Sequence, residues 1–599
     1  MNRFALPFSL FAGLLILAPP TSFSEEKRRP NLVIFLADDQ GWGDLSTHGN
    51  TNLATPNIDS LAKDGTTLEN FYVCAVCAPT RAEFLTGRYH FRTGVSGVSE
   101  GTGRLNPDET TLPDLLQASG YTTGAFGKWH NGTQAPYHPL DRGFDEFYGF
   151  TSGHWGHYFS PPLDHNRKQV KGMGYLTDDL TNHALRFIEE HHKKPFLCYV
   201  PFNTPHSPFY VDDNFYEKFE SLDPAMRNRD PKKENLPATR AALAMCENID
   251  WNVGRILRKL DALGLSEDTI VVYFSDNGPN SFRWNGGMKG KKGSTDEGGL
   301  RSPFLIRWPG QIPAGRTVTE VAGAIDLLPT LTELTQVPAK TAKPIEGRSF
   351  ASLLKGDPKA EWPDRQLFSV WGEKRMTVRT ARFRMDEKGS LFDIQNDRGQ
   401  HHNVADKHPE VAAELRQALA SYRLEADKHF AANADRPFTV GYAASTTLPA
   451  RDGIPHGTIQ RSSKAPNNSF FTHWTQQDDS ITWDIQVGVA GGYQATVLYT
   501  CPSPNVGTRI RLAWGDSTTE TTVTEAFDPP LWDKSKERVA KSHYFVKDFK
   551  PLELGLLTLK TGRNQLTLTA PSLVGDRGID VYSLLLERVD KEAEATPKE

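Results

Sequence analysis

Four apolar runs in the first half of the chain each stop at polar residues. The runs span residues 31–37, 121–127, 195–201 and 269–274, and helical patterns such as that of residues 238–263 lie between them. Strands that alternate with helices predict a mostly parallel sheet, in which ligands bind beyond the carboxyl ends of the strands. We therefore expect the polar residues that follow these runs to meet at one edge of a sheet.

The remainder of the chain divides into two parts by residue composition and pattern. Short strand-like runs within residues 368–396 and an amphipathic helix at 409–422 indicate a small α+β lobe. After about residue 435, polar sequence rich in Pro and Gly gives way to short alternating strands, which are typical of a β-sandwich. The predicted fold class is therefore α/β, with a large mixed, mostly parallel sheet flanked by helices, a small α+β lobe and an appended β-sandwich. The predicted segments are a signal peptide at 1–24, the α/β domain at 28–365, the lobe at 366–430, a linker at 431–479, the β-sandwich at 480–590 and a charged tail at 591–599.

The first residues have the pattern of an export signal. Arg3 supplies a positive end, residues 4–18 are mostly apolar, and residues 22–24 offer small side chains for cleavage. This run is shorter than the roughly 20 apolar residues that a membrane-spanning helix needs, and no later segment reaches that length. We expect an exported protein, periplasmic or secreted, without a membrane span.

Charge and cysteine content exclude some classes of protein. The 599 residues contain 68 Lys and Arg against 73 Asp and Glu, a net charge of −5. Because nucleic-acid binding rests on a basic footprint, we expect no nucleic-acid partner. Five cysteines in a chain of this length are too few, and odd in number, for a disulfide scaffold. At least one cysteine therefore needs another explanation.

Acidic residues follow two of the predicted strands. Asp38 and Asp39 come after the first apolar run, and Asp276 and Asn277 come after the fourth. Three carboxylates brought together without a cation would repel one another strongly, so their convergence implies a divalent metal. Oxygen ligands favour calcium or magnesium over zinc, and ligands from separate strands suit the tolerant geometry of calcium. Taken singly, each pair is also typical of a turn.

A second group of polar residues surrounds Cys77. Pro79 is well placed to open a helix, which would put Cys77 at a helix N-terminus, where backbone dipoles and Arg81 favour an anion. By spacing alone, Cys77 is equally a buried structural cysteine or one half of a redox pair with Cys74. No thioredoxin-like context surrounds the pair, which argues against the redox interpretation.

Cys77, Pro79 and Arg81 match the CxPxR pattern of type I sulfatases. The chain resembles these formylglycine-dependent, arylsulfatase-like enzymes of the alkaline-phosphatase-like superfamily from about residue 28 to 428. Thr80 stands where serine is common and Asn131 where leucine is usual, but neither replaces a residue of the pattern. Further matching segments are 37–44, 55–59, 85–88, 127–130, 205–206, 275–278 and 292–299.

The resemblance implies a mechanism. Cys77 would be converted to formylglycine by a maturation enzyme before export, and the hydrated aldehyde, ionised with the help of the metal and Arg81, would attack the sulfur of a sulfate ester. A covalent sulfo-enzyme would then release sulfate as the aldehyde reforms. Calcium is the expected ion, ahead of magnesium. The residues that the resemblance places around it are Asp38, Asp39, Cys77, Asp276 and Asn277.

The resemblance also gives roles to four further side chains. Lys128, His206 and Lys292 would hold the sulfate oxygens and assist the leaving alcohol, and His130 would lie beside the hydrated aldehyde. Positive groups act most strongly where negative charge develops in the transition state. We favour His206 as the general acid, with Lys292 as the alternative. Taken in isolation, His206 would be better explained as an ordinary loop histidine, and Lys292 as part of a solvated basic turn.

The expected substrate is a sulfate ester, with a sulfated saccharide as the natural one and aryl sulfates as simple substitutes. One alternative is a phosphatase or phosphodiesterase of the same superfamily, although these generally use Ser or Thr, two zinc ions and more histidine ligands. Another is an inactive glycan-binding protein, which the presence of every expected site residue disfavours. Residues 154–158 could line a substrate pocket or form an ordinary loop. For Trp483, Trp514 and Trp532 we favour sandwich core over sugar stacking.

Overall fold

The chain folds around a ten-stranded, mostly parallel sheet, described by a computed structural model that covers residues 1, 28–372, 375–539 and 544–589. The strand order is β11-β2-β10-β9-β1-β8-β4-β5-β6-β7. Strands β9, β1, β8, β4 and β5 run parallel, and β10, β6 and β7 add antiparallel pairs at the two sides. The predicted α/β fold class is confirmed. The proposed signal peptide after Met1 and the tail at 591–599 lie outside the described residues.

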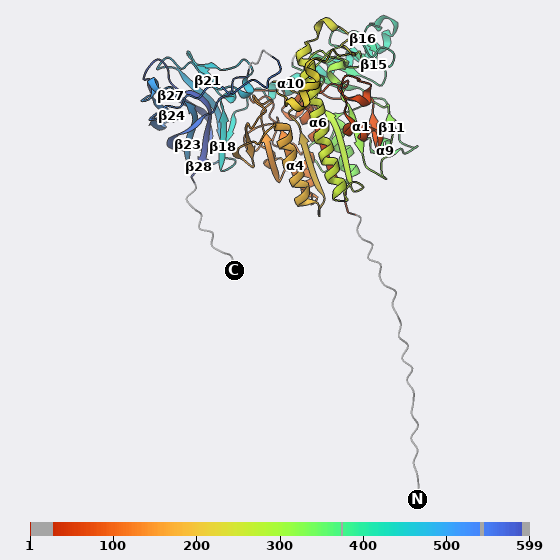
Figure 1. Ribbon diagram of the computed structural model, residues 1–599, viewed down its shortest axis with the longest axis horizontal. Coiled ribbons are helices and arrows are strands. Elements are labelled where there is room, and N and C mark those ends of the chain that lie inside the picture. Colours follow the sequence, from red (N-terminus) through yellow and green to blue (C-terminus); the bar gives the residue numbers. More distant parts are fainter. Residues whose placement is uncertain (2–27, 373–374, 540–543, 590–599) are drawn as a thin grey trace.

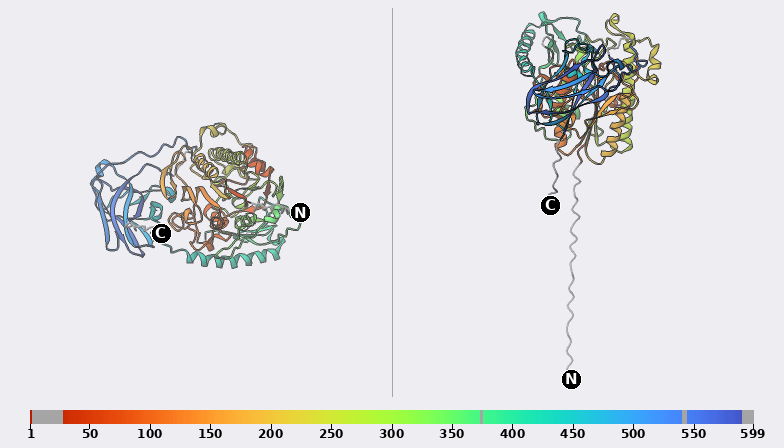
Figure 2. Two further views of the ribbon diagram at one scale, coloured as in Figure 1. Left: turned by 90° about the horizontal axis from the view of Figure 1, so that it is seen from below. Right: turned by 90° about the vertical axis from the view of Figure 1, so that its left-hand side faces the viewer.

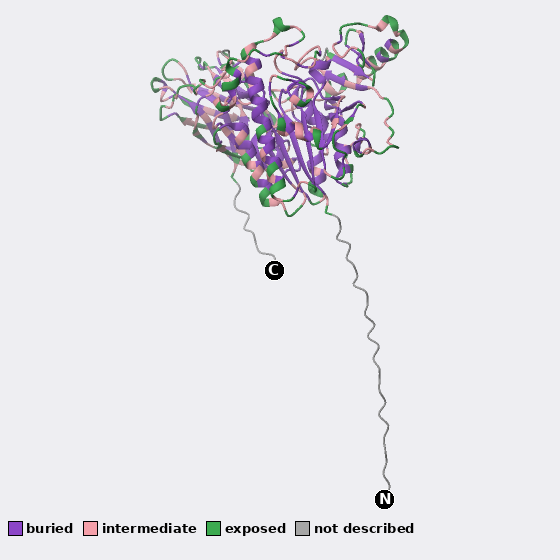
Figure 3. Cartoon of the chain, turned by 45° about the vertical axis from the view of Figure 1, so that its right-hand side comes forward, coloured by how far each residue is buried: buried purple, intermediate pink, exposed green. Residues whose placement is uncertain are grey.

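The four predicted strands are the buried centre of this sheet (Figure 3). Their bounds are Asn31–Ala37 for β1, Thr122–Lys128 for β4, Phe196–Pro201 for β8 and Thr269–Ser275 for β9. The other strands of the sheet are β2 (Thr66–Leu68), β5 (Glu146–Phe150), β6 (Pro162–His165), β7 (Lys168–Lys171), β10 (Phe304–Arg307) and β11 (Arg316–Val318).

Helices cover both faces of the sheet. Since successive side chains of a strand point to opposite faces, each buried strand contributes to two separate hydrophobic cores. Val33 and Phe35 of β1 pack into a core shared with α1, α4, α5 and α6, whereas Leu32 and Ile34 face a core shared with α2, α3, α8 and α9. The helices of the first face are α1 (Pro56–Lys63), α4 (Leu176–His191), α5 (Asp213–Glu220) and α6 (Leu236–Ala262). Those of the second are α2 (Cys77–Thr86), α3 (Leu112–Ala118), α8 (Leu327–Leu334) and α9 (Ala351–Lys355).

The small lobe consists of a four-stranded antiparallel sheet and helix α10 (Pro409–Ala432). Seen from below in Figure 2, α10 lies along one side of the main domain. Its inward-facing Leu415 and Ala426 pack against two small cores under the lobe sheet. The helix extends ten residues beyond the predicted amphipathic pattern, which ended at Tyr422. The lobe strands are β13 (Leu367–Trp371), β14 (Arg375–Arg379), β15 (Phe383–Met385) and β16 (Leu391–Asp393).

The C-terminal domain is a sandwich of two six-stranded sheets that lies beside the main domain (Figure 1). Both sheets contribute side chains to one core, which contains Trp483 and Trp514, as the core interpretation expects. Trp532 is not part of this core, because its ring packs against His157 of the main domain. One sheet comprises β17 (Phe438–Val440), β19 (Ile454–His456), β22 (Ser480–Val487), β24 (Arg509–Trp514), β25 (Ser517–Thr522) and β27 (Gly562–Ser572). The other comprises β18 (Ser445–Pro449), β20 (Gln460–Arg461), β21 (Phe471–Thr472), β23 (Gly491–Thr500), β26 (Lys550–Leu559) and β28 (Asp580–Arg588).

The segment 431–479, expected to be a linker, supplies five of these strands. They are only two to five residues long, and Pro and Gly interrupt the sequence around them, so no alternating pattern develops. Their pairing partners come from strands more than 100 residues away in several cases, such as Thr446 opposite Leu586. Among the described residues, none of the helices combines the length and the apolar character needed to cross a bilayer.

Candidate functional site

The polar residues that follow the central strands meet at the carboxyl edge of the sheet. Asp38 and Asp39 follow β1, Asp276 and Asn277 follow β9, and Lys128 is the last residue of β4. All five side chains are fully buried. The parallel register of these strands brings their ends together, which is the arrangement that the sequence pattern predicts.

Each acid of this group faces one cation. Arg81 Nη2 lies 2.7 Å from Asp276 Oδ2, and Lys128 Nζ lies 2.8 Å from Asp38 Oδ2. Lys292 Nζ, on the loop that follows β9, lies 2.6 Å from Asp39 Oδ1.

Three oxygens in the same cluster have no hydrogen-bond partner among the described residues. They are Asp38 Oδ1, Asp39 Oδ2 and Asn277 Oδ1, and all three are buried. The amide of Asn277 donates to Asp39 Oδ1 at 2.8 Å, which leaves its own oxygen turned away from that bond. Buried acceptors without partners are costly unless a ligand satisfies them. The donor set therefore fits a hard divalent cation bound through oxygen.

Electrostatics supports the same conclusion. Burial, together with the neighbouring Asp38, raises the pKa of Asp276 to about 6, and burial raises the pKa of Asp38 as well. Burial also opposes ionisation of Asp39, but His206 and Lys292 hold the pKa of that carboxyl below its usual range. A bound cation would remove the cost of keeping all three carboxylates ionised.

Cys77 is the first residue of helix α2 and faces this acid cluster. Its sulfur and oxygens of Asp38 and Asp276 lie within 4.8 Å of one another. Burial raises the pKa of the Cys77 thiol, although Lys128 and Lys292 act in the opposite direction. Burial thus favours the neutral thiol over the thiolate at this position.

The two departures from the sulfatase pattern have clear structural roles. The Thr80 hydroxyl accepts a hydrogen bond from the backbone N–H of Cys74 at 2.9 Å and donates to the Asp276 carbonyl at 2.6 Å, as a serine hydroxyl could. The Asn131 amide reaches the carbonyls of Ala78 and Gly103, both at 3.3 Å. Both residues hold the segment that carries Cys77.

The remaining predicted side chains surround the cluster. His206 Nε2 approaches Asp39 Oδ2 to 3.5 Å, and its Nδ1 lies 2.5 Å from the Ser207 carbonyl. Burial lowers the pKa of His206 to about 3. His130 Nε2 lies 2.8 Å from the Val98 carbonyl, and burial followed by the charge of Lys128 depresses the pKa of its ring.

Comparisons with known proteins agree with this geometry. The sequence profile of the sulfatase family matches residues 30–337, and that of the C-terminal part of N-sulphoglucosamine sulphohydrolase matches residues 291–425. The chain belongs to the sulfatase family. Its β-sandwich lies beyond both matches.

Individual relatives and solved structures extend the comparison. N-acetylgalactosamine-6-sulfatase of Mus musculus is 33% identical over 396 residues, which cover 59% of this chain and 71% of the relative. Steryl-sulfatase of Mus musculus is 30% identical over 450 residues, which cover 59% of this chain and 69% of the relative. The crystal structure of Ps i-CgsB in complex with k-i-k-neocarrahexaose superimposes with a TM-score of 0.61 at 27% identity, covering 68% of this chain and 98% of that one. This chain is therefore a sulfuric ester hydrolase.

Three further residues lie next to the site of this sulfatase. The sequence leaves His154 open between a pocket and an ordinary loop, and it carries no signal for Asn467 and Tyr544 of the sandwich. No spacing signal could have found the latter two, because only the docking of the sandwich brings them near the sheet edge.

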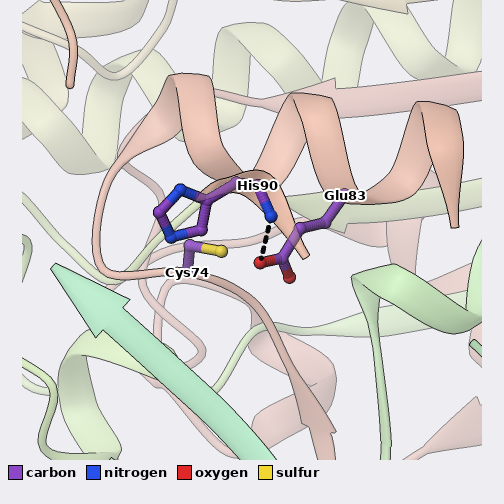
Figure 4. A group of neighbouring side chains, drawn as sticks. All are labelled: Cys74, Glu83 and His90. Atoms are coloured by element: carbon purple, nitrogen blue, oxygen red, sulfur yellow. Dashed lines mark hydrogen bonds between the residues drawn. The ribbon is translucent and has the colours of Figure 1, made fainter. Parts of the chain in front are cut away.

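A second buried cluster, Cys74, Glu83 and His90, lies on α2 and its flanking segments (Figure 4). Glu83 Oε1 accepts a hydrogen bond from the His90 backbone N–H at 3.2 Å, and Cys74 is also hydrogen-bonded to Glu83. The two ring nitrogens of His90 lie 2.7 Å and 3.2 Å from the carbonyls of Val95 and Val370. Because each ring nitrogen faces a backbone carbonyl, we interpret the cluster as structural. Cys74 and Cys77, both free thiols, thus point into different clusters.

The burial of Glu83 leads to a pH-dependent prediction. Burial raises its pKa from 4.5 to about 8, so the folded protein binds this proton more tightly than the unfolded chain does. The stabilisation is complete below about pH 4.5 and is lost as the pH rises towards about 8. We expect Glu83→Gln to remove this loss, so that the stability of the variant relative to wild type increases from about pH 5 to about pH 8.

Urea unfolding across that pH range measures the difference. Glu217→Gln, at an exposed glutamate of α5, is the matched control and should track the wild type at every pH. A Glu83→Gln curve that runs parallel to the wild-type curve would show that Glu83 is ionised in the folded protein.

Proposed function

We propose that this sulfatase is exported and hydrolyses sulfate monoesters on saccharides, using a formylglycine formed from Cys77 and one calcium ion. The observation that carries the proposal is the set of three unpartnered oxygens of Asp38, Asp39 and Asn277 beside the side chain at position 77. The formylglycine hydrate would supply the nucleophile that the buried thiol lacks. Bound calcium would supply a Lewis acid that favours the ionised oxygen.

Side chains of the protein itself bind the sulfate group and transfer the proton. Arg81 is fixed by Asp276 and by the Lys128 carbonyl at 2.6 Å, so its charge is held next to position 77 without further reorganisation. Lys128 and Lys292 present positive charge to the sulfate oxygens. His206 and Lys292 both border Asp39, and we assign protonation of the leaving alcohol to this pair. The negative charge of a bound sulfate ester would raise the low pKa of His206 and so favour the protonated ring.

Two considerations support a saccharide substrate. A relative is named N-acetylgalactosamine-6-sulfatase, and a structural neighbour was solved with k-i-k-neocarrahexaose. The export signal predicted at residues 1–24 would bring the enzyme to the periplasm or the medium, where sulfated polysaccharides are met. The family match and the sulfatase names of the relatives favour this function over phosphate-ester hydrolysis, and the convergence of every predicted site residue disfavours an inactive glycan-binding protein.

The maturation step can be measured directly. Trypsin should release residues 64–81, which contain Cys74 and Cys77 in one peptide. In protein coexpressed with a formylglycine-generating enzyme, we expect this peptide to carry one alkyl group after thiol alkylation, because Cys74 remains a thiol while position 77 is an aldehyde. Cys77→Ser should give an inactive protein, whereas Cys74→Ser should still be converted. A doubly alkylated peptide from active enzyme would contradict the proposal.

Calcium should stabilise the fold through the unpartnered oxygens. We expect chelation to lower the melting temperature and added calcium to restore it, with a stabilisation of about 2.7 kcal/mol at a calcium concentration of 100 times Kd. Asn277→Ala should abolish the calcium-dependent shift, and Asn564→Ala, at an exposed sandwich position, should keep it. Equal calcium shifts in Asn277→Ala and wild type would place the ion elsewhere.

A substrate panel tests the class of ester. The panel holds para-nitrophenyl sulfate, para-nitrophenyl phosphate, N-acetylgalactosamine-6-sulfate and k-i-k-neocarrahexaose. We expect matured enzyme to release sulfate from both the aryl ester and at least one saccharide, and to leave the phosphate ester intact. Release of phosphate at a comparable rate would favour the phosphatase alternative, and turnover of the aryl sulfate alone would contradict the saccharide proposal.

A further inference from the structure

The C-terminal sandwich places an aromatic side chain at the edge of the active site. Tyr544 precedes strand β26 and lies with its ring 4.8 Å from the ring of His154, in an edge-to-face arrangement. Its hydroxyl lies 3.3 Å from the Ser207 hydroxyl, one residue beyond His206.

His154 connects Tyr544 to the catalytic centre. Its ring is nearly parallel to that of His206, with centroids 5.6 Å apart, and only 6% of the residue is exposed. Asn467 of the sandwich points its amide Nδ2 at His154 Nδ1 from 3.4 Å. Because an amide nitrogen can only donate, Nδ1 is the acceptor and the proton of the neutral ring is on Nε2. That Nε2 is buried and has no hydrogen-bond partner among the described residues.

The sandwich packs closely against the loop that carries His154. A Cβ at Gly153 would lie 2.5 Å from both Asn467 Nδ2 and His130 Nε2. A Cβ at Gly156 would lie 2.2 Å from Asn468 Nδ2. Glycine at both positions lets side chains of the sandwich, Asn467 and Asn468, lie directly against the backbone of the loop. The loop therefore forms one wall, with the catalytic centre on one side and the sandwich on the other.

A neighbouring pair shows what ordinary packing between these domains looks like. The ring centroid of His157 lies 5.1 Å from that of Trp532, and both of its ring nitrogens are engaged. Nδ1 accepts from the Phe159 backbone N–H at 3.1 Å, and Nε2 donates to the Asp533 carbonyl at 3.0 Å. That histidine has no capacity left for a ligand. His154 differs, because one nitrogen is fixed by the sandwich and the other remains available within the described structure.

We propose that Tyr544 and His154 form a subsite for the sugar ring that carries the sulfate ester, so that the sandwich supplies part of the specificity of the enzyme. The Tyr544 ring contacts the sugar, and His154 Nε2–H donates to one of its oxygens. Asn467 is a positioning residue that fixes the tautomer of His154. The inference rests on the proposed saccharide substrate and adds where the sugar is recognised.

The test compares matched variants of the full-length, matured enzyme. Tyr544→Ala removes the ring, Tyr544→Phe keeps it, and Phe545→Ala removes the adjacent exposed aromatic ring as a control. The kinetic constants kcat and KM are measured on para-nitrophenyl sulfate, N-acetylgalactosamine-6-sulfate and k-i-k-neocarrahexaose. Melting temperatures show whether each variant is folded.

We expect Tyr544→Ala to lower kcat/KM on a saccharide by a factor about tenfold greater than on the aryl ester, mainly through KM, because the proposed subsite binds a sugar ring, which the aryl ester lacks. Tyr544→Phe should stay within about threefold of wild type on both substrates, and Phe545→Ala should match wild type. An equal loss on saccharide and aryl sulfate, or no loss on either, overturns the subsite while leaving the proposed function intact. Wild-type enzyme that cleaves neither saccharide overturns the proposed substrate class, and the subsite with it.

Discussion

Charge balance among buried groups governs this active site. Asp38, Asp39 and Asp276 are removed from water, and each pairs through one oxygen with a single buried or half-buried cation. The cluster is therefore formally neutral before any ion binds. A divalent cation held by the oxygens that remain would make the site strongly positive, which is what an anionic sulfate ester requires. The same ion pairs fix the positions of Arg81, Lys128 and Lys292.

The parallel sheet brings these charged side chains together. Strands β1, β9 and β4 end at one edge, so residues as far apart in the sequence as Asp38 and Asn277 lie within one cluster. The close approach of the β4 backbone to β8 also helps to position the charged groups. A Cβ at Gly127 would lie 1.9 Å from the Pro201 carbonyl oxygen, so only glycine lets β4 run this close to β8 and carry Lys128 to Asp38.

Local patterns were sufficient for the main domain and insufficient for the interface between domains. Buried parallel strands are continuous apolar runs, so the sequence around Asp38 and Asp276 revealed both the strands and their common edge. The short strands of 438–472 have no such pattern, because their pairing is decided by distant partners. Tyr544 and Asn467 reach the site only through the docking of the sandwich. The sequence carries no signal for Glu83, because its burial beside Cys74 and His90 depends on how the chain folds around α2.

The central claim is that one divalent ion lies between the strand ends and the side chain at position 77. Anomalous diffraction from crystals of matured, active protein grown with calcium tests it most directly. We expect a single peak at about 2.3–2.6 Å from Asp38 Oδ1, Asp39 Oδ2 and Asn277 Oδ1. A map without a peak there, or with the ion bound elsewhere and these oxygens hydrogen-bonded to other groups, would contradict the account.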